Sequence, residues 1–469
     1  MSFSSMRVQV KKYAAHQALP WLLERATEDR VGRFVHWMER LSISAHHRAQ
    51  FRYLGKLVEE KHPSLQLIQR LRHLHPNVRR AFINSLLVNA TLTGEIERKA
   101  FRAARGTPLP PYLIVISPTM RCNLACYGCY AGHYPRERDP LSFEVLDRIV
   151  TEGTEMGVYF FTISGGEPFL RPDLLDLYEK HPECFFQIYT NGTRIDDRAI
   201  ARMQRCGNVA PAISIEGWEE QTDARRGPGA YATLMSTMDA LREAGLAFGF
   251  SATATRRNVE CYFDESFYDH LVAKGCLFGW FFLFVPVGQD NTTDLMITPL
   301  QRHRLRQTVS RLRFTKPLFA ADFWDDGCLS GGCMSGGSLY LHVNYRGDLE
   351  PCVFMHFAED NVLDYYRRGK HLSEVLDTPL FQRLRAINRK DPNLLRPCPL
   401  IDHNEWLEEV LKETQARPTH PGAENIVTSL APEVRAWAEE YRRLADHVWY
   451  DTDEYAWAQK KGDPLWDSD

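Results

Sequence analysis

In the stretch YLIVISPTMRCNLACYGCY, residues 112–130, a short apolar run is followed at once by a loop with three cysteines. The run LIVIS (113–117) is rich in β-branched residues, which is typical of a strand buried on both faces of a parallel sheet. Parallel α/β folds carry their chemistry in the loops at the carboxyl ends of the strands. The order of strand and cysteine loop therefore predicts an α/β fold with a functional site in this loop.

Further apolar runs of strand length follow along the chain and alternate with helical patterns. They are YFFTIS (159–164), FFQIYT (185–190), APAISIEG (210–217), FGFSATAT (248–255) and WFFLFVPVG (280–288). This alternation indicates parallel strands joined by helical crossovers, in either a barrel or an open doubly wound sheet. About six units are present, fewer than the eight of a full barrel, so we predict a partial (β/α)6 TIM-like barrel.

The segment RGTPLPPY (105–112) concentrates proline and glycine and separates this pattern from a helical region before it. In that region apolar residues recur at helical spacing from Val78 to Ala90, and the pattern is predicted to end near Gly94. We therefore predict four parts: a basic helical N-terminal domain (1–107), the partial barrel (108–310), a small auxiliary domain (311–400) and an acidic helical C-terminal tail (401–469).

Charge is distributed unevenly, although the net charge is only −3. Residues 1–107 hold 19 Lys and Arg against 8 Asp and Glu, whereas residues 401–469 hold 7 against 16. The simpler interpretation is that the basic head (residues 1–107) and the acidic tail (residues 401–469) pack together and neutralise each other's charge. The alternative is that the basic head faces a polyanion, and charge alone does not distinguish nucleic acid from an anionic membrane surface.

The first residues, MSFSSMRVQVKKYAAHQ, lack the apolar core of a signal peptide, and no apolar run has membrane-spanning length. A cytoplasmic location is therefore expected. The 11 cysteines are an odd number, so reduced thiols for metal or redox chemistry are favoured over a disulfide framework.

The cysteine loop itself offers three thiolates, from Cys122, Cys126 and Cys129, and the next cysteine is Cys184. A structural zinc site takes four ligands, usually as two separated pairs. A four-iron cluster tolerates three thiolates better, because one iron is then open to a small molecule with nitrogen and oxygen donors.

The C-x3-C-x2-C loop after the first strand, with SGGEP (164–168) after the second, resembles the radical S-adenosylmethionine (radical SAM) superfamily. The resemblance covers roughly residues 112–290. It implies a [4Fe–4S] cluster on Cys122, Cys126 and Cys129, with S-adenosylmethionine on the open iron. It also implies reductive cleavage of that cofactor to a 5′-deoxyadenosyl radical, which removes a hydrogen atom from a substrate.

The same resemblance assigns cofactor-binding residues along the strand ends. Gly165, Gly166 and Glu167 would hold the methionine amino group. Asn191, after Thr190, would line the same cofactor-binding site. Ser214 and Glu216 in SIEG would meet the ribose or the carboxylate, and Arg226 matches a position that often contacts that carboxylate. The loop departs from the family at Gly128, where an aromatic residue is common, so Tyr127 or Tyr130 is expected to cover the adenine instead.

A second set of cysteines lies beyond the barrel, at Cys328, Cys333, Cys352 and Cys398. Four thiolates are enough for a second cluster, and GGSLYLHVNYRGDLEPCVFMH (336–356) is similar to the auxiliary-cluster domains called SPASM or, in the one-cluster form, Twitch. Cys328 is the least secure match, and ligation by three thiolates with an open iron is an alternative. A four-thiolate zinc site is another.

The remaining candidates are given structural roles. Asp322, Asp325 and Asp326 are expected to be solvated loop residues, and His342 and His356 are expected to be structural. Cys184, Cys206, Cys261 and Cys276 are expected to be buried free thiols.

The resemblance constrains the radical and not its target. The basic head, with Trp21 and Trp37, favours contact with an anionic membrane and a lipid-like substrate. The alternative enzyme function is maturation of a ribosomally made peptide, and a non-catalytic iron–sulfur scaffold or sensor represents another class. A ferredoxin or flavodoxin would supply the electron, and a nucleic-acid partner is not favoured.

Overall fold

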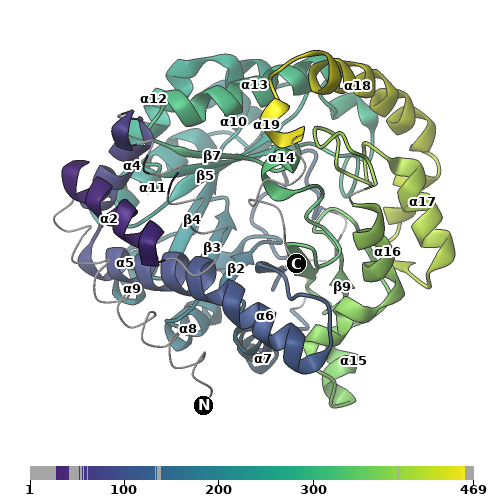
Figure 1. Cartoon of the computed structure of the whole chain (residues 1–469), viewed down its shortest axis with the longest axis horizontal. Coiled ribbons are helices and arrows are strands. Elements are labelled where there is room, and N and C mark those ends of the chain that lie inside the picture. Colours follow the sequence, from purple (N-terminus) through teal and green to yellow (C-terminus); the bar gives the residue numbers. More distant parts are fainter. Residues whose placement is uncertain are drawn as a thin grey trace.

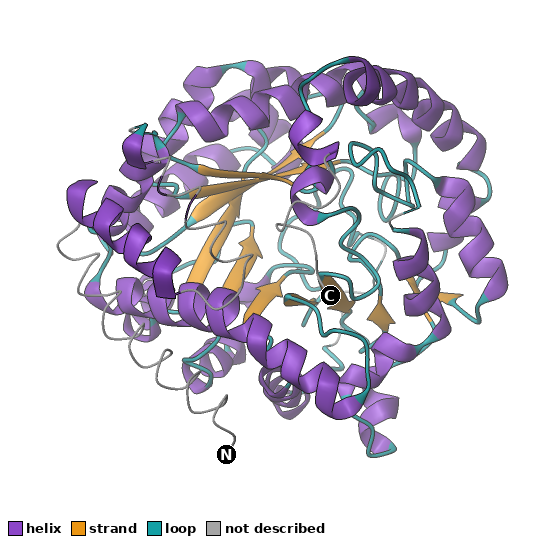
Figure 2. Cartoon of the chain, viewed as in Figure 1, coloured by secondary structure: helices purple, strands orange, loops and turns teal. Residues whose placement is uncertain are grey.

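The computed structural model of the chain describes residues 28–41, 52, 55, 58–60, 62–132, 134, 139–388 and 390–459. Strands occupy the middle of the molecule and helices form a rim around them (Figures 1 and 2). The α/β class predicted from the sequence is confirmed, since most of the sheet is parallel and is flanked by helices.

One nine-stranded sheet carries the fold, in the order β7-β6-β5-β4-β3-β2-β1-β8-β9. Strands β1 to β7 and β8 run parallel to their neighbours, and β9 is antiparallel to β8. The strands are β1 (Leu113–Ile116), β2 (Phe160–Ile163), β3 (Phe185–Thr190), β4 (Val209–Ser214), β5 (Gly249–Ala254), β6 (Phe278–Leu283), β7 (Phe319–Asp322), β8 (Tyr340–Val343) and β9 (Leu349–Glu350). The six predicted strands are thus present, and β7 and the β8–β9 ribbon extend the sheet at its two edges.

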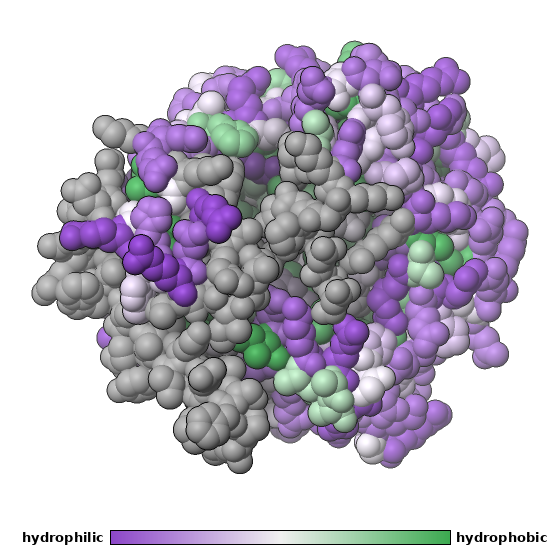
Figure 3. Space-filling model, in the orientation of Figure 1, coloured by the Kyte–Doolittle hydropathy of each residue, from purple (hydrophilic) through white to green (hydrophobic). Residues whose placement is uncertain are grey.

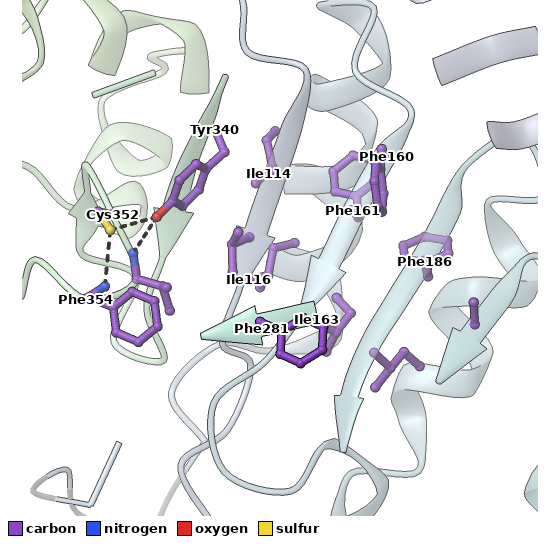
Figure 4. Close-up of a cluster of buried hydrophobic side chains, with 14 of the residues drawn as sticks. Ile114, Ile116, Phe160, Phe161, Ile163, Phe186, Phe281, Tyr340, Cys352 and Phe354 are labelled. Atoms are coloured by element: carbon purple, nitrogen blue, oxygen red, sulfur yellow. Dashed lines mark hydrogen bonds between the residues drawn. The ribbon is translucent and has the colours of Figure 1, made fainter. Parts of the chain in front are cut away.

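Helices connect the strands and cover the outer face of the sheet. They are α7 (Phe143–Glu155), α8 (Asp173–Lys180), α9 (Asp197–Cys206), α10 (Glu219–Arg226), α11 (Ala230–Glu243), α12 (Glu265–Lys274) and α13 (Pro299–Thr315). Ile114, Ile116, Phe161 and Ile163, on neighbouring strands, belong to the main hydrophobic core and are fully buried (Figure 4). The residues that alternate with them on β1 and β2 line an interior cavity, as the two-residue period of a strand requires.

The auxiliary segment continues the barrel sheet, because β8 pairs with β1 in register from Leu113↔Tyr340 to Ile116↔Val343. A buried hydrogen-bond chain reinforces this junction. His342 Nδ1 lies 2.7 Å from Glu350 Oε2, and its Nε2 lies 2.7 Å from Ser117 Oγ. His342 therefore joins the ribbon to the end of β1, and the division of the chain at residue 310 stays a prediction.

The described part of the N-terminal region is helical, with α2 (Glu28–Leu41), α4 (Ser64–Leu71), α5 (Pro76–Ala81), η1 (Phe82–Thr93) and α6 (Gly94–Arg105). The prediction of a helix end near Gly94 is wrong, because α6 continues to Arg105. A Cβ at residue 94 would lie 2.8 Å from the Gly157 carbonyl oxygen, so this glycine allows a close approach to the chain after α7. The helix ends instead at Gly106, in the left-handed conformation (φ 68°).

Helix α14 (Gly327–Ser330) precedes the ribbon. After the ribbon the chain forms α15 (Val362–Arg367), α16 (Pro379–Ile387), α17 (Asn404–Glu413), α18 (Ala431–Asp451) and α19 (Ala456–Gln459). Helix α18 lies beside α13 at the rim of the molecule (Figure 1). The fully buried guanidinium of Arg302, on α13, links this helix to the loop after β7 and to the segment before α17. It pairs with Asp325 Oδ1 at 2.9 Å and with Asp402 Oδ1 at 2.5 Å.

The described surface on the face in Figure 3 is mostly hydrophilic, with separate hydrophobic spots. Trp37 is 44% exposed, whereas Trp21 lies outside the described residues. Among the helices that the structure describes, none is long and apolar enough to cross a membrane.

Candidate functional site

The three cysteines of the first loop meet at one end of the interior cavity. Cys122, Cys126 and Cys129 are half-buried and all line this cavity, at the carboxyl end of β1. Burial, with a smaller contribution from the neighbouring Cys126, raises the pKa of the Cys129 thiol. A positively charged metal centre would offset this cost of ionising clustered thiols, so the donor set fits an iron–sulfur cluster with three thiolate ligands.

The glycines after β2 are needed because the cysteine loop lies directly against them. A Cβ at Gly165 would be 2.4 Å from the Thr119 carbonyl oxygen, and one at Gly166 would be 2.2 Å from the Arg121 carbonyl oxygen. The Gly166 and Glu167 amides donate to these same two carbonyls, each at 2.8 Å. The motif therefore positions the loop by backbone contact, and both glycines line the cavity.

Glu167 is buried beside the cavity and is not among the residues that line it, and its contact with the cofactor stays a prediction. Its carboxylate is fully buried and accepts hydrogen bonds from Thr190 Oγ1 (2.8 Å), the Asn191 amide (2.8 Å) and the Phe169 amide (3.0 Å). Burial raises the pKa of Glu167, although these bonds oppose the shift. In this arrangement Glu167 joins the end of β2 to the end of β3.

Polar groups from β3 and β4 face the cavity beside the cysteines. Asn191 lines it together with Thr190, and its Nδ2 lies 3.8 Å from Cys122 Sγ. Ser214, the last residue of β4, also lines it and pairs with Ser251 Oγ at 3.1 Å. The contact of Asn191 and Ser214 with the cofactor stays a prediction.

Glu216 is buried beneath two arginines and does not line the cavity. Its Oε1 lies 2.7 Å from Arg225 and 2.5 Å from Arg226. Burial opposes ionisation, but the two guanidinium groups hold the pKa of Glu216 below its usual value. Arg225 also donates to the Tyr127 carbonyl oxygen at 3.1 Å, and both arginines line the cavity. Glu216 therefore orients the cations that face the site.

The structure explains the glycine at position 128. Gly128 adopts φ 63°, and a Cβ there would lie 2.8 Å from the ring of Phe284. Phe284, just after β6, lines the cavity together with Gly128. The sequence does not reveal Phe284, because nothing local connects it to the cysteine loop. Tyr127 lies outside the cavity lining, with its ring against Arg257 at 4.9 Å.

Tyr130 is the tyrosine of this loop that lines the cavity. Its hydroxyl lies 2.7 Å from Ser164 Oγ and accepts the Gly165 amide at 3.1 Å. Burial raises the pKa of Tyr130 to about 12, so the hydroxyl is neutral and connects the cysteine loop to the glycine motif.

Away from the cysteines, the cavity runs along the barrel interior between uncharged walls. It reaches the first residues of β1 and β2. The apolar and aromatic lining is Leu113, Val115, Phe160, Tyr189, Trp280, Phe282, Phe323, Met334, Leu339, Tyr340, Val353 and Phe354. Such a cavity suits the apolar part of a substrate held close to the cysteine loop.

A second, smaller cavity adjoins the first and is lined by Cys333, Cys352 and Cys398. Burial raises the pKa of Cys333 and of Cys352 to about 12 and raises that of Cys398 as well. Cys352 is buried and the other two are half-buried, and three such thiols around one space fit a second metal centre.

The structure does not bring Cys328 to this cavity. Cys328 packs with Tyr441, Trp449 and Tyr455 in a separate hydrophobic cluster, and burial raises the pKa of its thiol to about 12.

Other candidates take structural places. Asp322 and Asp325 are buried, so the expectation of solvated side chains is wrong for them. Burial, together with the nearby carboxylates, raises the pKa of Asp322 well above its usual value. His356 lies 2.7 Å from His420 and 3.0 Å from the Val353 carbonyl oxygen. Cys184 and Cys276 are buried, whereas Cys206 and Cys261 are only partly so.

Comparison with known proteins identifies the class. Residues 116–255 match the family model of the Radical SAM superfamily, so this part of the chain is a radical SAM domain. Domains of this superfamily are enzymatic and use S-adenosylmethionine with a [4Fe–4S] cluster.

Individual relatives agree with this assignment. The mycofactocin maturase MftC of Mycobacterium ulcerans is 34% identical over 153 residues, which are 32% of this chain and 42% of that protein. The AdoMet-dependent heme synthase of Nitratidesulfovibrio vulgaris is 25% identical over 304 residues, 56% of this chain and 80% of that protein. The chain thus spans less than half the length of the maturase that it matches.

Among solved structures, Streptococcus suis SuiB bound to S-adenosylmethionine superimposes with a TM-score of 0.53 at 18% identity, covering 66% of this chain and 76% of that one. SuiB bound to the precursor peptide SuiA gives a TM-score of 0.51 at 18% identity, covering 66% and 75%. These likenesses concern the fold.

Proposed function

We propose that the chain is a radical SAM enzyme that modifies a peptide, with an auxiliary cluster beside the substrate cavity. One observation carries the proposal: the three cysteines of a radical SAM domain line a cavity that shares a wall with a second cavity, lined by three further cysteines. When bound, the cluster and S-adenosylmethionine supply a 5′-deoxyadenosyl radical for hydrogen abstraction.

The chain's own residues hold and shield this chemistry. Cys122, Cys126 and Cys129 would ligate the first cluster. Backbone at Gly165 and Gly166, the amide of Asn191 and the guanidinium of Arg226 face the space beside it and would orient the cofactor. The apolar walls exclude water, which protects a reactive radical from competing reactions.

Cys333, Cys352 and Cys398 would ligate the auxiliary cluster, with one iron left without a thiolate from the chain, because Cys328 lies outside this cavity. A ferredoxin or flavodoxin would deliver electrons to the first cluster. A zinc site at the same thiols is the competing assignment, and metal analysis distinguishes the two.

The substrate class rests on the relatives and the cavity together. The similarity to the maturase MftC and the fold shared with SuiB, which is known bound to its precursor peptide, favour a peptide. A lipid-like substrate at an anionic membrane is the second candidate, favoured by the apolar cavity walls and the exposed Trp37.

Radical chemistry is tested with protein reconstituted anaerobically with iron and sulfide, reduced with dithionite and given S-adenosylmethionine. Wild type is expected to form 5′-deoxyadenosine and to hold about eight irons. Cys126→Ala is expected to form none and to hold about four, and Cys352→Ala to hold about four. Cys328→Ala, the matched control, is expected to keep about eight. Wild type with both clusters and no 5′-deoxyadenosine on any substrate would contradict catalysis and favour an iron–sulfur sensor.

The substrate class is tested with two fractions of the source cells, peptides below 10 kDa and total lipids. Each is incubated with wild type and with Cys126→Ala, and mass spectrometry searches for species altered only by wild type. An altered peptide supports the proposal. An altered lipid with unaltered peptides would replace it with the second candidate.

A further inference from the structure

Four side chains are shared by the linings of the two cavities. Phe323, Met334, Tyr340 and Phe354 line both the substrate cavity and the cavity of the second cysteine set. Of these four described residues, Tyr340 alone carries a hydroxyl group. Within this shared wall, Tyr340 therefore supplies the side-chain hydroxyl that can bond to a cysteine of the second site.

The Tyr340 hydroxyl is directed at a cysteine sulfur. Tyr340 is the first residue of β8, and its oxygen lies 2.7 Å from Cys352 Sγ (Figure 4). The Val353 amide donates to the same oxygen at 3.4 Å. Because that amide occupies a lone pair, the phenolic hydrogen is the group left to bond the sulfur. The Phe354 amide also donates to Cys352 Sγ at 3.4 Å.

Both partners of this hydrogen bond are buried. Tyr340 is 3% exposed, and its hydroxyl, which accepts the Val353 amide, is placed to donate to the sulfur. Cys352 is also buried, so negative charge on its sulfur is poorly stabilised by solvent and depends on nearby donors.

We propose that Tyr340 raises the reduction potential of the auxiliary cluster through a hydrogen bond to the Cys352 thiolate. The inference rests on the auxiliary cluster of the proposed function. One added electron increases the negative charge on the cluster and its thiolates, so a donor at the sulfur stabilises the reduced form more than the oxidised form. Tyr340 acts as a tuning residue, and its ring is at the same time part of the substrate cavity wall.

The test compares Tyr340→Phe with wild type, both reconstituted anaerobically, by redox titration monitored with electron paramagnetic resonance. The auxiliary midpoint potential is expected to shift to a more negative value. The potential of the first cluster, in the same molecule, is expected to stay unchanged. Iron is measured on each sample, and about eight irons per chain are required for the comparison.

Tyr345→Phe is the matched control. Tyr345 is equally buried and lies just after β8, but its hydroxyl accepts a hydrogen bond from Arg346 and it lines neither cavity. Its loss is expected to leave both potentials unchanged. An auxiliary potential that does not move in Tyr340→Phe, or that moves equally in Tyr345→Phe, would overturn the inference.

A second variant covers the case in which Tyr340→Phe fails to hold the auxiliary cluster. Site-specific 3-fluorotyrosine at position 340 keeps the shape of the side chain and is a stronger donor, so the auxiliary potential is expected to become more positive. An unchanged or more negative potential would again refute the role of Tyr340. Absence of auxiliary iron in the wild type would instead refute the cluster assignment on which the inference rests.

Discussion

Replacing Arg302 by methionine would remove the cation from a buried group of charges that holds three parts of the molecule together. The Arg302 side chain is fully buried and pairs with Asp325 from the loop after β7 and with Asp402 before α17. Its guanidinium also lies 3.9 Å from the ring centre of Tyr441 on α18. Methionine keeps much of the volume but leaves two buried carboxylates without their partner.

Breaking a buried ion pair by removing one member costs about 3–5 kcal/mol. Two carboxylates lose their cation here, but burial already raises the pKa of Asp325. Asp325 would then take up a proton in the variant, which limits the cost of the second carboxylate. We therefore expect the free energy of unfolding to fall by about 3–5 kcal/mol rather than by twice that.

The assay is urea unfolding of the metal-free chain under reducing conditions, followed by circular dichroism. Arg304→Met, on the same helix, is the matched control. The Arg304 side chain is 59% exposed, and its guanidinium lies 3.5 Å from the Glu260 carboxylate, which is a longer contact than those of Arg302. It is expected to cost below about 1 kcal/mol. Adding Asp325→Asn and Asp402→Asn to Arg302→Met is expected to recover part of the loss, because the unpaired charges are then gone.

The same change should weaken the second cysteine site. Asp402 Oδ2 accepts the Cys398 amide at 3.1 Å, so the position of Asp402 bears on that cysteine. Arg302→Met is therefore expected to retain less auxiliary iron than Arg304→Met after desalting. A loss of stability below about 1 kcal/mol for Arg302→Met would refute the view that this charge group holds α13, α18 and the Cys398 loop together.

Two further predictions concern single side chains. Gly128→Ala would place a Cβ 2.8 Å from the Phe284 ring in a left-handed backbone conformation. We therefore expect the free energy of unfolding in urea to fall by about 1–3 kcal/mol and the iron content of the first cluster to fall. The double variant Gly128→Ala, Phe284→Leu should recover part of the stability and of the iron, and no recovery would contradict the packing explanation. Burial lowers the pKa of His181, but hydrogen bonds to Glu183 and Asp147 outweigh it, so the net pKa is raised above 6.5. The stabilisation by protonated His181 is then complete below about pH 6.5 and is lost as the pH rises through the raised pKa. The unfolding free energies of His181→Gln and wild type should therefore differ more at about pH 6 than at about pH 9. Equal differences at the two pH values would contradict a raised pKa of His181.

Local order along the chain was sufficient to predict the class of fold and the position of the first cysteine set. Strand-length apolar runs alternate with helical patterns, and this alternation has few solutions other than a parallel sheet with helical crossovers. The cysteine loop follows the first run, and strand ends share one edge of such a sheet. The convergence of Cys122, Asn191 and Ser214 on one cavity follows from that topology.

Side-chain direction could not be predicted in the same way. Glu167 and Glu216 stand in motifs for which cofactor contacts are predicted, and each carboxylate is buried among partners from other strands or helices. A carboxylate next to a cavity and a carboxylate beneath it have the same local sequence. Only the position of Thr190 and of the two arginines after Glu216 decides between them.

The radical SAM motifs, the alternation of strands and helices and the presence of a second cysteine set can be read from residues close together in the chain. The separation of Cys328 from Cys333, Cys352 and Cys398 depends on the folded arrangement, as does the place of Tyr340 in the wall shared by the two cavities. Residues hundreds of positions apart meet there through the pairing of β8 with β1. Such contacts arise when the whole chain packs, and residue spacing carries no record of them.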